Sequence, residues 1–171
     1  RAELLWFYQD GCNWLFPEAY AAFAAEIPAA ERGDMIAAYH RRLTGRDDEV
    51  RRRAAVAWSR WEAETLALIR DPVRGAQFGE PRFALAFARI ENHYFVNGGF
   101  LPADGFLLAE APRLAGIPGI IVQGRYDVVT PPRSAFELHR AWPGSELLIV
   151  DDAGHALSEP GISRALVEAA V

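Results

Sequence analysis

The sequence predicts an α/β protein in which a long helical region is followed by the last strands and helices of a parallel β-sheet. Two short apolar runs, Ile117–Gln123 and Glu146–Val150, have the composition of strands that are buried in such a sheet. The segment between them opens with Thr130-Pro131-Pro132, which marks the start of a helix. A strand, a helix and a second strand joined by short loops form a right-handed βαβ unit.

The helical region fills most of the chain before these strands, where apolar residues recur at the spacing of one helix face. Proline and glycine divide the region, because proline begins helices and glycine ends them. We expect helices over residues 18–25, 31–44, 47–69, 82–96, 104–111, 132–141 and 158–171. Residues 72–81 contain two prolines and two glycines and are expected to form a loop.

The composition is that of a globular protein and excludes several classes of partner. Of the 171 residues, 51% are hydrophobic and 24% are charged, which is typical of a chain with a hydrophobic core. The net charge of −5 argues against nucleic acid or an anionic membrane as a partner. No apolar run approaches the roughly 18 residues that a membrane span needs.

The chain has one cysteine, Cys12, which excludes an internal disulfide and favours a reducing compartment, the cytoplasm. We interpret Cys12 as a small apolar core residue rather than a nucleophile. No pair of histidine or cysteine residues has the spacing of metal ligands, so neither a metal nor another cofactor is expected.

A titratable residue follows each predicted strand: Asp127 comes after the first and His155 after the second. Ligands of open α/β sheets bind at the carboxyl ends of the strands, so both side chains are expected at one site. A histidine that takes a proton from a serine hydroxyl and a carboxylate that orients this histidine are two members of a catalytic triad. Each residue also has a simpler interpretation, Asp127 as a helix-capping aspartate and His155 as an ordinary turn histidine.

In α/β-hydrolases the triad follows the chain in the order nucleophile, acid, histidine, and the acid and the histidine have that order here. The nucleophile is missing, because no Gly-x-Ser-x-Gly motif occurs in the 171 residues. We therefore predict an incomplete α/β-hydrolase fold, the C-terminal portion of an enzyme. Two strands alone do not make a parallel sheet with both faces covered. We therefore expect the remaining strands of the sheet to come from sequence upstream of Arg1 or from another chain.

Motifs spread over almost the whole chain resemble those of one enzyme family. They are Trp6-Phe7-Tyr8-Gln9, Ala57-Trp58-Ser59-Arg60-Trp61-Glu62, Ala88-Arg89-Ile90-Glu91-Asn92-His93-Tyr94-Phe95, Gly124-Arg125-Tyr126-Asp127 and Gly154-His155. With these motifs the chain resembles the bacterial proline iminopeptidases, which are the prolyl aminopeptidases of the α/β-hydrolase superfamily. The resemblance implies a serine peptidase that uses no metal and releases a free N-terminal proline from peptides.

The resemblance also implies a division of the chain. Residues 1–11 would end a core segment, residues 12–110 would form a helical cap, and residues 111–171 would form the C-terminal part of the hydrolase core. Asp127 would be the triad acid and His155 the triad base. The upstream half, as one chain or as a companion chain, would supply the nucleophile, and without it this portion is expected to be inactive.

In the family, two glutamates of the cap hold the free amino group of the substrate, and Glu62 and Glu91 lie in the matching motifs. Glu64 competes with Glu62, but residues two apart on a helix lie on different faces, so only one should face the site. The alternative for each glutamate is an exposed helix charge or a structural ion pair, for instance with Arg60 or Arg89.

Tyr8 matches a residue that lines the family's pocket for the proline ring. Where family members carry a cysteine shortly after the triad acid, this chain has Thr130, a departure that concerns the shape of this pocket. Two carboxylates close together raise the pKa of at least one of them while the site is empty, so we expect activity to fall in mild acid.

Two other functions fit parts of the sequence. Another capped α/β-hydrolase, such as an esterase or an epoxide hydrolase, would use Asp127 and His155 but would leave the two cap glutamates without a role. A non-catalytic helical interaction module would use the aromatic residues of the helices to bind a partner helix, although core packing explains those residues more simply.

Overall fold

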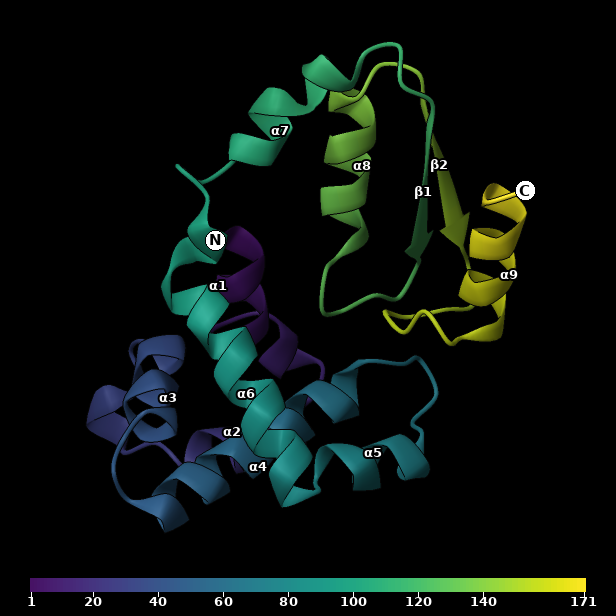
Figure 1. Ribbon diagram of the computed structural model, residues 1–171. Helices are drawn as coiled ribbons and strands as arrows, with labels where there is room; N and C mark the ends of the chain where they lie inside the picture. The colour runs from purple at the N-terminus through teal and green to yellow at the C-terminus, as the bar shows by residue number, and fades with distance from the viewer. The chain divides into compact units, whose positions relative to one another are not determined.

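The computed structural model describes residues 1–171, which fold into two compact units (Figure 1). The first unit comprises Arg1–Thr65 and Arg70–Phe100, and the second comprises Leu66–Ile69 and Leu101–Val171. The expected boundaries at residues 11 and 110 refer to the cap and core of a complete hydrolase and stay predictions. No helix has the length and the apolar character that crossing a membrane requires.

The first unit is built from helices that surround one long central helix. Its α-helices are α1 (Ala2–Tyr8), α2 (Pro17–Ala25), α3 (Met35–Leu43), α4 (Asp48–Thr65), α5 (Pro72–Phe78) and α6 (Pro81–Val96). Short 3-10 turns complete the unit: η1 (Cys12–Trp14), η2 (Ala29–Glu31) and η3 (Gly98–Phe100). Helix α4 packs against α2, α3, α5 and α6, so its residues form the centre of this unit.

Aromatic rings make the core around α4. Trp58 and Trp61, which the helical spacing placed on one face, are both fully buried. The ring of Trp58 stacks on Tyr8 with a centroid distance of 4.5 Å, and Phe23 stacks on Tyr39 at the same distance. Contacts of this kind contribute about 0.5–1.5 kcal/mol each beyond the area that they bury. Core packing therefore accounts for the aromatic residues of α4.

Two of the expected helices have one end that lies four residues from its expected position, the start of α3 and the end of α4. Helix α3 begins at Met35 instead of residue 31, because the Asp34 carboxylate accepts the backbone N–H of Ala37 at 3.0 Å and caps the helix there. Helix α4 ends at Thr65 instead of residue 69. The hydroxyl of Thr65 bonds back to the carbonyl groups of the preceding turn, at 3.0 Å each.

The loop expected over residues 72–81 is wrong, because most of it forms helix α5. The Asp71 carboxylate accepts the backbone N–H groups of Val73 and Arg74, and Pro72 occupies the first helical position. Phe78, at the end of α5, packs 5.1 Å from Phe83 of α6. Asp71-Pro72 thus starts a helix in addition to closing the previous one. Helix α1, for which no element was expected, is the other addition.

The second unit contains the predicted parallel strands. Its elements are α7 (Phe106–Glu110), the 3-10 turn η4 (Ala111–Leu114), β1 (Gly119–Gly124), α8 (Pro132–Ala141), β2 (Ser145–Val150) and α9 (Pro160–Ala169). Strands β1 and β2 pair in parallel, and both lie between α8 and α9, each of which contacts both strands (Figure 1). The α/β class and the strand–helix–strand order predicted from the sequence are confirmed.

The strands are less covered than their apolar composition indicated. Ile120 of β1 is 43% exposed and Leu148 of β2 is 40% exposed. Parallel sheets normally have both faces covered by other elements, and two helices over two strands do not achieve this here.

Cys12 is fully buried, in agreement with its interpretation as a core residue. Burial, with a smaller contribution from the negative charge of Glu62, raises the pKa of the Cys12 thiol to about 12. The thiolate is the reactive form, so the folded first unit should protect this residue.

We expect iodoacetamide to leave Cys12 unmodified in the native full-length protein at pH 8 and to alkylate it fully in denaturant, as measured by mass spectrometry of the peptide that contains it. Rapid alkylation of the native protein would contradict this burial.

Candidate functional site

Asp127 and His155 meet at the carboxyl ends of the two strands. Gly124, the last residue of β1, is in register with Val150, the last residue of β2, so the loops that follow leave the sheet side by side. His155 Nδ1 lies 2.9 Å from Asp127 Oδ2. The side chain of Asp127 is only 5% exposed, whereas that of His155 is 35% exposed. The structure thus brings together the two residues that the strand-end argument predicted to share a site.

Asp127 accepts four further hydrogen bonds. Its Oδ1 accepts the backbone N–H groups of Val129 at 3.0 Å and Thr130 at 2.8 Å. Its Oδ2 accepts the Thr130 hydroxyl and the Gln123 side-chain amide, each at 3.0 Å. The capping interpretation of Asp127 is wrong, because Pro131 occupies the N-cap position of α8.

These hydrogen bonds decide the charge of Asp127. Burial on its own raises the pKa of this carboxyl group, but the hydrogen bond and charge of His155 and the two bonds from Thr130 outweigh burial and lower the pKa below its usual value. An ionised carboxylate only accepts hydrogen bonds, so His155 must carry its proton on Nδ1. Nε2 is then the basic atom of the ring.

Backbone contacts hold the loop that carries His155. The backbone N–H of His155 donates to the carbonyl of Leu66 at 3.0 Å. A Cβ atom on Gly154 would lie 2.9 Å from the backbone nitrogen of Leu68, and one on Gly124 would lie 1.9 Å from the carbonyl oxygen of Gly154. Glycine is therefore needed at both positions for close packing.

Glu159 is a structural residue of this loop that we did not predict. Its carboxylate accepts the backbone N–H groups of Gly154, Ala156 and Leu68 at 3.0–3.1 Å. Ser158-Glu159-Pro160 indicated only the start of the last helix. The acidic residue before the proline was the available signal, but its partners include a residue 91 positions away in the chain.

Glu62 and Tyr8 form a buried pair in the first unit. Glu62 lies on α4 and is 3% exposed, and the hydroxyl of Tyr8 donates a hydrogen bond to its carboxylate. Burial and then the charge of Glu91 raise the pKa of Glu62 well above its usual value, and the Tyr8 bond opposes this rise. The expected rise in the pKa of one carboxyl group is confirmed, although burial contributes more than the neighbouring carboxylate.

Glu64, the competing residue on α4, forms an ion pair with Arg70 at 2.5 Å and is partly exposed. Only Glu62 of the two is buried in the unit, which agrees with residues two apart lying on different faces of a helix, and its facing a substrate site stays a prediction. The bond from Tyr8 also replaces the ion pair with Arg60 that was the alternative for Glu62.

Glu91 lies on α6 beside this pair and is half-buried. The indole N–H of Trp58 donates to Glu91 Oε2 at 2.8 Å. Tyr8 is 2% exposed and its ring contacts other aromatic side chains, so its assignment to a proline pocket stays a prediction. The five predicted residues therefore form two clusters: Asp127 with His155 in the second unit, and Tyr8 with Glu62 and Glu91 in the first.

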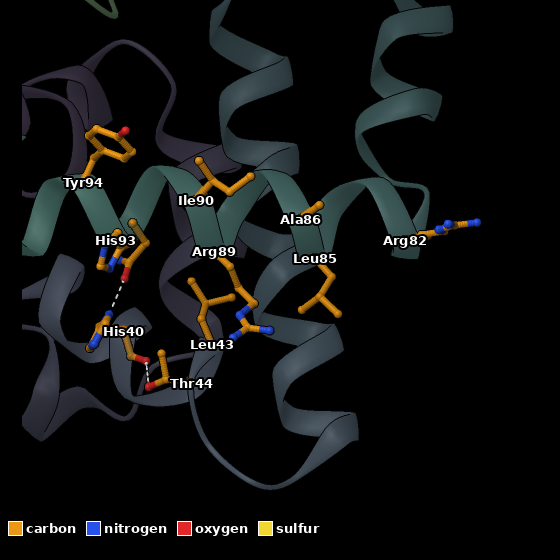
Figure 2. A pocket seen from close by; sticks show the side chains of 11 residues that line it. His40, Leu43, Thr44, Arg82, Leu85, Ala86, Arg89, Ile90, His93 and Tyr94 are labelled. Carbon is orange, nitrogen blue, oxygen red and sulfur yellow. Dashed lines mark hydrogen bonds between the residues drawn. The ribbon is translucent and has the colours of Figure 1, made fainter.

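A surface pocket of about 590 Å³ lies between α3 and α6 (Figure 2). His40 and Leu43 of α3, with Thr44 directly after the helix, lie opposite residues of α6 that include Leu85, Arg89 and His93. None of the predicted site residues lines this pocket, and its lining contains no carboxylate. His40 is fixed there by a 2.9 Å hydrogen bond between its Nδ1 and the side-chain oxygen of Asn92.

Comparison with known protein families finds a match in the C-terminal part of the chain. Residues 108–170 match the family model described as TAP-like protein, which is an α/β-hydrolase family. This range contains Asp127, His155 and the whole of the paired sheet. The fold class predicted for the second unit is therefore compatible with a known hydrolase family.

Nearly the whole chain is similar to curated proline iminopeptidases. It is 55% identical over 169 residues to a probable proline iminopeptidase from Leptolyngbya boryana, which covers 99% of this chain and 53% of that protein. It is 49% identical over 171 residues to the proline iminopeptidase of Arabidopsis thaliana, and this match covers 99% of this chain and 45% of the plant protein. It is 43% identical over 170 residues to the proline iminopeptidase of Neisseria gonorrhoeae, and this match covers 98% of this chain and 53% of the bacterial protein. The resemblance inferred from the motifs is confirmed, and the chain spans about half the length of these relatives.

The raised pKa of Glu62 has a consequence for stability. The folded protein retains a proton on Glu62 at pH values where the unfolded chain has released it, so this residue lowers stability increasingly as the pH rises above its unfolded pKa of about 4.3. Glu62→Gln removes this effect. We expect the melting temperature of the variant relative to the unchanged full-length protein to increase between pH 5 and pH 8, as measured by calorimetry.

Glu64→Gln is the matched control for this experiment, since Glu64 lies on the same helix and is partly exposed. The difference in melting temperature between Glu64→Gln and the unchanged protein should vary little over the same pH range. A Glu62→Gln difference that stays constant with pH would show that Glu62 ionises normally in the folded protein.

Proposed function

We propose that this chain is the helical cap and the C-terminal part of the core of a serine aminopeptidase that releases N-terminal proline from peptides. The chain would contribute the triad acid Asp127 and the triad base His155. The upstream half of the same protein would contribute the nucleophilic serine, the oxyanion hole and the remaining strands. The single buried cysteine supports a location in the cytoplasm.

The proposal depends on the similarity of nearly the whole chain, helical unit included, to proteins named proline iminopeptidase. The match of residues 108–170 to a hydrolase family would fit an esterase or an epoxide hydrolase equally well. The helical unit favours the aminopeptidase, because it contains two carboxylates in a closed aromatic environment that neither alternative would use. The close approach of Asp127 and His155 argues against a non-catalytic interaction module.

The Asp127–His155 geometry supports the catalytic role. With its proton held on Nδ1 by Asp127, His155 would accept the serine proton at Nε2 as the serine attacks the carbonyl group of proline. The same atom would then donate this proton to the leaving amino group of the second residue. Asp127 would stay ionised and stabilise the imidazolium, for which its lowered pKa is suited.

Glu62 and Glu91 support recognition of the substrate's amino group. An ammonium group that enters a closed site loses its water, and a carboxylate partner must replace that hydration. A peptide with a blocked amino group would leave these carboxylates without a cationic partner, which is how a polar site rejects an analogue. Because the pKa of Glu62 is raised in the empty site, binding of the ammonium should release a proton from it, and affinity should fall in mild acid.

The first test compares proline p-nitroanilide with its N-acetyl form, using the full-length protein. We expect cleavage of the free amine only, and a reduction of kcat/KM by about 10- to 100-fold in Glu62→Gln and in Glu91→Gln, because each variant loses one charge that faces the ammonium. Glu64→Gln should keep the activity of the unchanged protein. Cleavage of both substrates, or of simple esters alone, would leave a hydrolase but exclude the aminopeptidase.

The second test concerns the triad acid. Asp127→Asn should reduce kcat by about 10⁴-fold, because the amide would favour the wrong tautomer of His155. Asp151→Asn is the matched control, since Asp151 also follows a strand but forms an exposed ion pair with Arg125 at 3.1 Å. A normal kcat in Asp127→Asn, or an equal loss in both variants, would contradict the assignment of the acid.

A further inference from the structure

One stacked aromatic pair in the first unit contacts the carboxylates of both Glu62 and Glu91. The rings of Tyr8 and Trp58 stack with a centroid distance of 4.5 Å and an angle of 22° between their planes. The hydroxyl of Tyr8 donates to Glu62, and the indole N–H of Trp58 donates to Glu91 at 2.8 Å. Each ring thus supplies one polar hydrogen to a different carboxylate, and the stacking fixes the two donors relative to each other.

We infer that Trp58 is a positioning residue for substrate recognition, because its indole N–H holds the Glu91 carboxylate in the orientation that receives the substrate's ammonium group. This inference rests on the amine-binding role proposed for Glu91. Trp58 itself would not touch the substrate. It would act through Glu91 and thereby contribute to selectivity for a free N-terminal amine.

The packing around Trp58 makes its N–H a fixed donor. Trp58 is fully buried. Besides Tyr8, its ring packs against Tyr39 and Phe95, with centroid distances of 5.3 Å and 6.2 Å. A ring enclosed in this way cannot turn its N–H to another acceptor without disturbing its neighbours. The direction of the bond to Glu91 is therefore set by the core of the unit.

The side chain of Glu91 has more rotatable bonds to order than the enclosed ring of Trp58. A glutamate side chain has three rotatable bonds, and fixing such a side chain costs up to about 1.5–2 kcal/mol of conformational entropy. Glu91 is half-buried, so only part of its side chain is enclosed by packing. A charge-assisted hydrogen bond from a rigid donor selects one conformation before the substrate arrives, which reduces the entropy lost on binding.

Trp61 shows that burial of a tryptophan in this core does not by itself require an N–H partner. It lies three residues after Trp58 on α4 and is 1% exposed, yet its Nε1 has no hydrogen-bond partner. The two tryptophans therefore share helix, burial and aromatic surroundings, and they differ in the carboxylate that only Trp58 contacts. This difference provides a matched control within the same helix.

The test compares Trp58→Phe with Trp61→Phe in the full-length protein. Trp58→Phe should raise KM for proline p-nitroanilide about tenfold and change kcat less than about twofold, since the variant loses one hydrogen bond to a charged group. The p-nitrophenyl ester of cyclopentanecarboxylic acid, which has the ring without the amine, should be hydrolysed equally well by the unchanged protein and by Trp58→Phe. Trp61→Phe should change neither substrate's KM.

A variant that replaces Trp58 by 3-benzothienylalanine keeps the bicyclic shape and removes only the N–H, so it keeps the inference testable where phenylalanine impairs folding. An unchanged KM for the anilide in this variant would overturn the inference, and so would an equal loss for both substrates in a variant that melts normally. Glu91→Gln separates the amine-binding role of Glu91 from the positioning role of Trp58. If Glu91→Gln leaves KM for the anilide unchanged, the proposed amine site is wrong. If Glu91→Gln raises this KM and the Trp58 variants do not, only the positioning role is excluded.

Discussion

The loop that carries His155 depends on the end of helix α4 at Thr65. Up to Thr65 the helix places Trp58, Trp61 and Glu62 inside the aromatic core of the first unit. After it, the chain leaves the helix, and the carbonyl of Leu66 becomes available to the backbone N–H of His155. If α4 continued to residue 69, as its pattern predicts, this carbonyl would belong to the last turn of the helix and would point along the helix axis instead. Thr65 reinforces the end because its hydroxyl occupies carbonyl groups of the last turn.

The two buried carboxylates show how donors decide the state of an acid. Asp127 receives five hydrogen bonds, one of them from His155, and its pKa is lowered despite burial. Glu62 receives a bond from Tyr8, lies near another carboxylate, and its pKa is raised. Both residues are therefore suited to different tasks, a permanent charge that orients an imidazole and an ionisable group that responds to an incoming cation.

The strand ends were predictable because local patterns determine them. Two apolar runs fixed β1 and β2, and parallel pairing then required Asp127 and His155 to be neighbours. The spacing of Glu62 and Glu64 also sufficed to decide that only one of them faces inward. Such predictions succeed where a residue's place follows from the period of its own element.

Pairings between distant segments could not be predicted in the same way. Tyr8 and Glu62 are 54 positions apart, and Trp58 and Glu91 are 33 positions apart, so neither bond follows from a helical or strand period. The motifs marked these residues as a group through resemblance, but not their partners. Helix α5 was missed for a different reason: Asp71-Pro72 satisfies the rules for ending one helix and for beginning the next, and only the packing of Phe78 decides between them.

The uncovered strands bear on how this chain would behave when expressed without further sequence. Ile120 and Leu148 present apolar side chains on strands whose edges offer unpaired backbone groups. Exposed strands of this kind are templates for pairing between copies, and they aggregate unless another element covers them. The limiting property of the isolated chain is therefore expected to be its colloidal behaviour, so solubility trials should start from a form that completes the sheet.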